Sequence, residues 1–279
     1  MRSLSGHLGR WRLLLILIQI AILPGIVPAR ADESLNVESV AAAALANNRS
    51  FIEPNTLKRW QRPVKIHYIS DCSLDSMQAD EARLTQLNKF IAEIDRLNTS
   101  LAMSPVLLEC QYEHSPAVDA PFGVAIIPGG GISKVREVLA RGIFGDGSEI
   151  LSASLNPENI KALEQGCTNS RTGKAGSHEI IAATIYADPH ILNEDMNFCI
   201  KLGLMGILGF NAHNMPKNTE SILSLSWKDS DLTDLDSCLI EILYSKRLRE
   251  SDLQRPKFFS LLPQLIRESE HCQRKATKG

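Results

Sequence analysis

Beyond its first 31 residues, the sequence has no apolar run approaching the ~20 residues that a membrane-spanning helix needs. It also has no excess of basic residues, because 30 Lys and Arg stand against 32 Asp and Glu. A protein that binds nucleic acid through its phosphates normally carries a basic patch or stripe. We therefore expect no membrane span in the mature chain and no nucleic-acid partner.

Several signatures of catalysis are absent as well. The sequence has no G-x-S-x-G nucleophile elbow. Two glycine-rich stretches, Pro128–Gly131 and Thr172–Gly176, match neither the P-loop nor the dinucleotide-binding pattern. Lys174 is followed by Ala175, which has no hydroxyl to offer a magnesium ion. We interpret both stretches as ordinary turns and expect no cofactor.

The pair His178-Glu179 begins like the H-E-x-x-H zinc motif, but the fifth position of that pattern is Ala182. The residues that follow Glu179 predict a strand rather than a helix, which would place positions 178 and 182 too far apart to share one ion. We interpret the pair as the polar start of a strand.

The N-terminus has the three parts of a secretory signal peptide. Arginines at positions 2, 10 and 12 precede the apolar run Leu13–Val27, and the small-residue site Ala29–Ala31 follows it. We predict cleavage after Ala31 and a periplasmic or secreted mature chain. The leader contains four arginines and no acidic residue, so the mature chain would hold 26 basic and 32 acidic residues, a formal charge of −6. No cysteine adjoins the cleavage site, so we expect no lipid anchor.

The cysteines all lie beyond the predicted leader, at Cys72, Cys110, Cys167, Cys199, Cys238 and Cys272. An even number in an exported chain predicts disulfide bonds. No two are spaced two to four residues apart, as structural zinc sites normally require. Their order along the chain suggests pairs 72–110, 167–199 and 238–272.

Hydrophobic periodicity predicts the helices and strands. The clearest amphipathic helix covers residues 80–101, where apolar residues recur every three or four positions. Further helices are expected at 37–46, 133–143, from 156, 195–209, 232–247 and 256–269. Strands are expected at 60–69, 106–112, 122–127, 148–155 and 178–187, the first with the alternation of a half-buried strand. Residues 167–177 and 211–219 are predicted to be loops.

Helices and strands are mixed without strict β-α-β alternation, which favours an α+β fold with a mixed sheet packed against helices. The sequence has no internal repeat and no linker long enough to separate two domains. We predict a signal peptide at 1–31, one α+β domain at 32–254, and a C-terminal helix with a basic tail at 255–279.

Several segments share their order with a known family. Residues 57–66, LKRWQRPVKI, match an RW..PV.v opening, and Cys167 and the strand at 178–186 follow. Further matches are Cys199, the run Leu208–Phe210, and residues 221–223 and 235–248. Over residues 45–253 the chain resembles an uncharacterised family of exported proteobacterial proteins, domain of unknown function 2927. That resemblance implies a distant relation to zincin metallopeptidases and a zincin-like layout.

In that family, the helix after the cysteine usually reads C-x-x-E-E-x-x-Q-x-L-G-L, as though an H-E-x-x-H helix had kept its glutamate and lost its histidines. Here residues 199–210 read CIKLGLMGILGF. Leu202 and Gly203 occupy the acidic positions, and Gly206 occupies that of glutamine. Zinc hydrolysis requires His, Glu or Asp ligands and a carboxylate base. The resemblance therefore implies a pseudo-metallopeptidase without catalytic residues or metal ligands.

Glycines at 203, 206 and 209 fall three apart on nearly one face of this predicted helix. Each costs about 1 kcal/mol against alanine in a helix. We expect a buried helix that a neighbour approaches closely at this face, so that Gly206→Leu would overpack it.

The expected function is a binding or structural role in the periplasm, with an unknown protein or small-molecule partner. The polar site candidates are His178, Glu179, His213 and Asp236, of which Asp236 fits better as a helix-start or surface acid. One alternative is a divergent metal-dependent hydrolase or peptidase that uses histidines 67, 178, 190 or 213. Another is a periplasmic small-molecule-binding protein, which would need a pocket with convergent polar groups.

Overall fold

The computed structural model describes residues 36–46, 55–70, 72–110, 123–128, 167–174, 176–187, 193–211, 215–216, 219–224 and 231–278. Residues 35–279 form one compact unit. The predicted signal peptide, the elements predicted at 133–143, 148–155 and from 156, and the loop histidines His190 and His213 lie outside the described residues.

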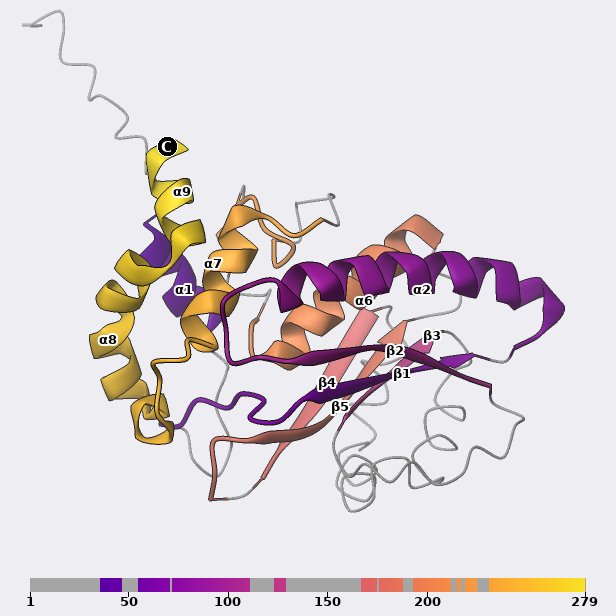
Figure 1. The fold of residues 1–279 in the computed structure, drawn as a ribbon, viewed down its shortest axis with the longest axis horizontal. Helices are drawn as coiled ribbons and strands as arrows, with labels where there is room; N and C mark the ends of the chain where they lie inside the picture. The colour runs from indigo at the N-terminus through magenta and orange to yellow at the C-terminus, as the bar shows by residue number, and fades with distance from the viewer. Residues whose placement is uncertain are drawn as a thin grey trace, which may run out of the picture. The chain divides into compact units, whose positions relative to one another are not determined.

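A five-stranded sheet organises the described part of the chain, with the order β2-β1-β3-β5-β4 (Figure 1). The strands are β1 (Val64–Ser70), β2 (Met103–Cys110), β3 (Gly123–Pro128), β4 (Cys167–Gly173) and β5 (Ile180–Ala187). β2, β1, β3 and β5 run parallel, and β4 is antiparallel to β5 at one edge. The predicted α+β class with a mixed sheet is confirmed.

Two of the parallel strands, β1 and β5, are almost completely buried. All eight residues of β5 are buried, and in β1 only Lys65 is exposed. The prediction of a half-buried first strand was therefore wrong. His67 and Ser70 of β1 are buried although they are polar, as is usual where both faces of a parallel sheet are covered.

Two helices lie on the same face of the sheet, α2 (Leu74–Asp95) and α6 (Asn193–Leu208) (Figure 1). Helix α2 is hydrogen-bonded to two strands. Asn88 Oδ1 of α2 accepts a hydrogen bond from the Val106 N–H of the edge strand β2 at 2.8 Å. Asp80 of α2 accepts one from Tyr68 Oη at 2.8 Å and another from Ser70 Oγ, both near the C-terminal end of β1. α2 begins earlier and ends earlier than the predicted 80–101.

Four more helices belong to the same unit: α1 (Val37–Ala44), α7 (Asp234–Leu243), α8 (Arg255–Glu268) and α9 (Glu270–Lys278). A 3₁₀ turn, η2 (Glu250–Leu253), precedes α8. A disulfide between Cys238 and Cys272 joins α7 to α9. This bond agrees with the pairing expected from chain order.

The structure differs from the predictions for three segments. Residues 167–173 form strand β4 rather than a loop, because the backbone of this polar run pairs with β5. The predicted basic tail is helical as far as Lys278. The predicted helix at 232–247 is shorter and ends at Leu243.

Two of the four remaining cysteines are disulfide-bonded, as predicted. Cys72 and Cys199 are disulfide-bonded, and no free cysteine occurs among the described residues. Cys110 pairs in register with Ser70, two residues before Cys72. Pairs 72–110 and 167–199 stay predictions.

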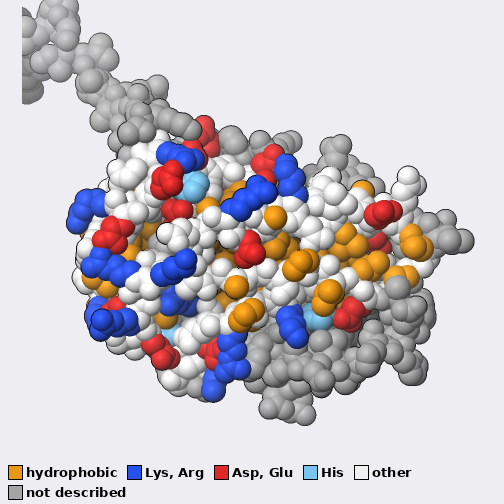
Figure 2. All heavy atoms as spheres, in the orientation of Figure 1, with side chains coloured by type: hydrophobic (Ala, Val, Ile, Leu, Met, Phe, Trp, Pro, Cys, Tyr) orange, Lys and Arg blue, Asp and Glu red, His pale blue; other side chains and the backbone are white. Residues whose placement is uncertain are grey.

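Large apolar side chains are also found at the surface of the described region. Met77 of α2 is 51% exposed, and Leu107 and Leu108 of the edge strand β2 are 49% and 44% exposed. Figure 2 shows hydrophobic side chains gathered in a band over the part of this face where α2 and β2 lie. No helix in the described ranges is both long and apolar enough to span a membrane.

Candidate functional site

Helix α6 contains the positions that the family resemblance assigns to a lost zinc site. It follows the buried strand β5 and packs against β5 and β4. Gly203 lies so close to β5 that a Cβ built there would be 2.6 Å from Cγ2 of Ile185. Ile185 is fully buried, so it has little room to yield. A side chain at 203 would require the helix and sheet to separate.

Gly206 faces the edge strand instead. A Cβ at this position would lie 2.5 Å from Nδ2 of Asn169 in β4. Asn169 is exposed, so its amide can swing away. The two glycines thus allow the predicted close approach of sheet and helix, but the contact at 203 is much less adaptable.

Gly209 does not belong to this packing face, in contrast to the prediction. It lies just past the helix with a φ of 120°, in the left-handed region that favours glycine. Its N–H donates to the Gly206 carbonyl at 3.1 Å, and the Phe210 N–H donates to the Met205 carbonyl at 3.2 Å. These two bonds form the Schellman motif that ends many helices.

The last carbonyls of α6 are bound by side chains from three distant segments. Arg171 Nη1 donates to the Gly206 oxygen at 2.6 Å, Trp60 Nε1 to the Ile207 oxygen at 3.1 Å, and Tyr244 Oη to the Leu208 oxygen at 2.8 Å. Carbonyls at a helix C-terminus have no partner within the helix, so Trp60 and Tyr244 satisfy two such acceptors, while the Gly206 oxygen accepts from both Arg171 and the Gly209 N–H.

The same burial affects the ionisation of these capping groups. It lowers the pKa of Arg171 to about 10 and raises the pKa of Tyr244 above its ordinary value. Both shifts have desolvation as their main cause. This buried helix end is a packing junction rather than an open site.

The RW pair of the family resemblance has a structural role here. Arg59 Nη1 and Nη2 donate to the carbonyls of Leu243 and Leu248, so this side chain binds the end of α7. Burial lowers the pKa of Arg59. Its neighbour Trp60 caps α6 in the same way. The segment before β1 therefore connects two helix ends.

His178 and Glu179 lie directly before β5, where a polar strand start was predicted. His178 Nδ1 is 3.1 Å from the Leu57 carbonyl oxygen, and Glu179 Oε1 is 2.9 Å from Arg62 Nε. Both side chains are buried. They bind the segment before β1.

Asp236 is a helix-start residue, as expected, but not a surface acid, because its side chain is fully buried. Its carboxylate accepts hydrogen bonds from Ser221 Oγ at 2.5 Å, the Ile222 N–H at 3.1 Å, and the hydroxyl and N–H of Thr233 at 2.7 and 3.1 Å. With Thr233 it forms the capping box of α7. Burial raises the pKa of Asp236, while these hydrogen bonds oppose the shift.

His67 is the remaining candidate histidine among the described residues. Its Nδ1 is 2.5 Å from Oε1 of Glu109 on the neighbouring strand β2. Within the described ranges, no group of three or more His, Cys, Asp or Glu side chains is placed to hold a metal ion. The structure therefore does not bring His67 and His178 together in such a group.

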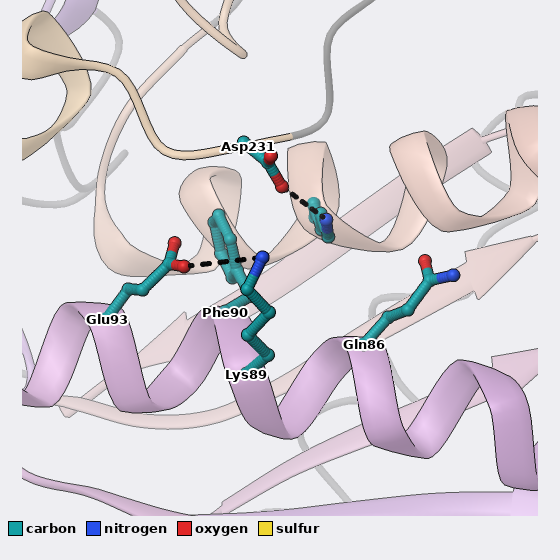
Figure 3. Close-up of a pocket in the computed structure, with 6 residues that line it drawn as sticks. Gln86, Lys89, Phe90, Glu93 and Asp231 are labelled. Atoms are coloured by element: carbon teal, nitrogen blue, oxygen red, sulfur yellow. Dashed lines mark ion pairs between the residues drawn. The ribbon is translucent and has the colours of Figure 1, made fainter.

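A polar pocket of about 320 Å³ lies between α2 and α6, and the sequence analysis missed it (Figure 3). Its lining consists of Gln86, Lys89, Phe90, Glu93, Lys201 and Asp231. In Figure 3, Lys89 of α2 extends toward the same space as Asp231, which precedes α7. One signal was available, because Lys201 is the only Lys, Arg, Asp or Glu between positions 196 and 216.

Lys201 lies deep in this pocket, with its side chain only 5% exposed. Its Nζ is 5.5 Å from the centre of the Phe90 ring and 3.8 Å from Oδ1 of Asp231. On α2, Lys89 Nζ lies 3.9 Å from Oε1 of Glu93. Both ion pairs are longer than a direct hydrogen bond. The pocket thus combines two ammonium groups with two carboxylates.

Comparison with known proteins identifies no relative: no family model, no curated protein and no solved structure matches the chain.

Proposed function

We propose that this chain is an exported, zincin-like module without peptidase activity that acts by binding. The observation that carries the proposal is the contact of Gly203 with Ile185, where even a Cβ would lie 2.6 Å from a buried methyl group. In the H-E-x-x-H pattern, this position supplies the carboxylate that takes a proton from the zinc-bound water. Ile185 of β5 occupies the space that a glutamate side chain at position 203 would need.

The arrangement around α6 supports the zincin-like part of the proposal. Gly209 ends the helix three residues after Gly206, which is the spacing of the glycine in the H-E-x-x-H-x-x-G pattern. The helix ends next to this glycine, whereas positions 202, 203 and 206 offer no metal donor. In this proposal, α6 serves to pack against β5 and β4.

Export is part of the same proposal. The predicted leader at 1–31 and the disulfide between α7 and α9 both suit an oxidising compartment. A secreted or periplasmic module stapled in this way would remain folded where thiols are oxidised.

Metal content tests the proposal. The full chain, expressed with its own leader and purified without chelator, is dialysed against zinc and then against metal-free buffer before elemental analysis. We expect far less than one zinc ion per chain and no change in melting temperature on adding zinc. Retention of about one ion per chain, lost in a His67→Ala or His178→Ala variant, would overturn the proposal in favour of the metal-dependent alternative.

A small-molecule-binding role is the second candidate, and the pocket beside Lys201 favours it. A pocket of about 320 Å³ falls at the lower end of the volumes that hold small ligands. It is built by α2, α6 and the segment before α7, away from positions 203 and 206, which face the sheet.

A further inference from the structure

The charge arrangement of the pocket between α2 and α6 points to a class of ligand, and this inference rests on the binding role proposed above. Lys89 and Lys201 contribute two positive charges, and Glu93 and Asp231 two negative charges. The side chains of Lys89 and Asp231 are 68% and 67% exposed, whereas that of Lys201 is buried. The pocket therefore has exposed charges at its rim and a buried ammonium group at its base.

Lys201 is held in a way that suits an incoming oxyanion. Burying an ammonium group is costly unless it is paired and hydrogen-bonded. The face of Phe90 stabilises it by a cation–π contact, and Asp231 stabilises it across 3.8 Å. A carboxylate entering the pocket can approach the Lys201 ammonium group to a direct charge-assisted hydrogen bond of about 2.8 Å.

The presence of both lysines and carboxylates in the pocket favours a zwitterionic ligand over a simple anion. A simple anion at the base would be repelled by Glu93 and Asp231, and a simple cation would be repelled by the two lysines. A molecule with a carboxylate and an ammonium group a few ångströms apart matches both pairs at once. Gln86 adds an amide that both donates and accepts hydrogen bonds.

We propose that this pocket binds the zwitterionic head of a free α-amino acid, with the carboxylate at Lys201 and Lys89 and the ammonium group at Asp231 or Glu93. The chemistry required is a small zwitterion, and no metal takes part.

Three probes of similar size separate the possibilities. The full chain is titrated with L-alanine, with propionate, which lacks the ammonium group, and with ethylamine, which lacks the carboxylate. We expect saturable binding of L-alanine by calorimetry or NMR, with each single-charge probe at least about tenfold weaker. Equal binding of propionate would reduce the pocket to an anion site, and the absence of saturable L-alanine binding would overturn the proposal.

Variants then locate the site. Lys201→Met and Asp231→Asn should each weaken L-alanine binding by at least about tenfold. Lys246→Met, which changes an exposed lysine bound to Asn98, should leave it unchanged. Because Lys201 is buried, Lys89→Met repeats the test at an exposed position. Undiminished binding in Lys89→Met and Asp231→Asn would contradict the assignment.

The zinc measurement is independent of this titration. Bound zinc without L-alanine binding would overturn both proposals, whereas a metal-free chain that ignores L-alanine would overturn only the ligand assignment.

Discussion

The indole N–H of Trp60 donates to the carbonyl oxygen of Ile207 at 3.1 Å, so a residue 147 positions earlier in the chain closes the end of α6. Tyr244 does the same for the next carbonyl, that of Leu208. The end of this helix is therefore completed only when the segment before β1 and the end of α7 are both in place.

Trp60→Phe removes the indole donor but keeps an aromatic ring. We expect a loss of about 1–3 kcal/mol in the free energy of unfolding, because a buried carbonyl is left without its partner. Hydrogen exchange should also accelerate in the last turn of α6. Denaturant unfolding and exchange mass spectrometry measure the two effects.

Tyr68→Phe is the control, since that hydroxyl binds Asp80 rather than the end of α6. It should lower stability without selectively exposing the last turn of α6. Unchanged exchange there in Trp60→Phe would mean that the indole does not hold the helix end.

The two glycines of α6 should respond differently to alanine. Gly203→Ala presses against the buried Ile185, and we expect it to cost about 1–3 kcal/mol. Gly206→Ala meets the exposed amide of Asn169, which can rotate away, and its better helix propensity of about 1 kcal/mol offsets the contact. Chemical denaturation of both variants compares them directly.

Gly206→Leu extends this test, because its larger side chain cannot be accommodated by moving one amide alone. We expect a loss of about 1–3 kcal/mol. An unchanged melting temperature would mean that this face of the helix is open.

Asp236→Ala should be among the most destabilising single changes. It leaves buried donors from Ile222 and Thr233 without their acceptor, and we expect a loss on the order of 3 kcal/mol. Ser221→Ala removes one donor to the same carboxylate and the acceptor of the Leu223 N–H, and it should cost less, about 1–2 kcal/mol. Comparable losses in the two variants would show that Asp236 is not the centre of this network.

The disulfide between α7 and α9 closes a loop with a sequence separation of 34. Replacing Cys238 and Cys272 by serine should lower stability by about 4 kcal/mol at most, through the greater freedom of the unfolded chain. Limited proteolysis should then cleave α9 first. Equal protease resistance of the variant and the parent chain would show that packing alone retains this helix.

Peptide mapping under non-reducing conditions tests the remaining cysteines. We expect bonds between Cys72 and Cys110 and between Cys167 and Cys199, with no free thiol in the denatured chain. Detection of six titratable thiols would end the disulfide interpretation.

Local sequence patterns predicted the helices and strands that have a clear hydrophobic pattern. The apolar run of β5 and the three- to four-residue spacing in α2 identify a strand and a helix, although α2 begins six residues before the predicted start. β4 was missed because its residues are polar, and an edge strand gains its conformation from pairing with β5. α9 was missed for a similar reason: its sequence is polar, and the bond to Cys238 and the contact of His271 with Glu241 hold it.

Long-range contacts account for what the sequence could not reveal about the site. Asp236 looks like any acid at a helix start, and only the chain around Ser221 encloses it. Lys201 becomes part of a pocket because α2 and the segment before α7 meet it. Such long-range contacts depend on the topology of the fold, which the hydrophobic periodicity of the sequence does not encode.

Arg59 has a consequence for where this chain can tolerate cleavage. Its backbone pairs beside β5 through the His178 carbonyl and the Ile180 N–H, while its guanidinium group binds the carbonyls of Leu243, the last residue of α7, and of Leu248. A protease that cut between Arg59 and Val64 would separate Arg59, with its contacts to β5 and α7, from strand β1. The product without Arg59 would lose both its backbone pairing beside β5 and its hydrogen bonds to the carbonyls of Leu243 and Leu248.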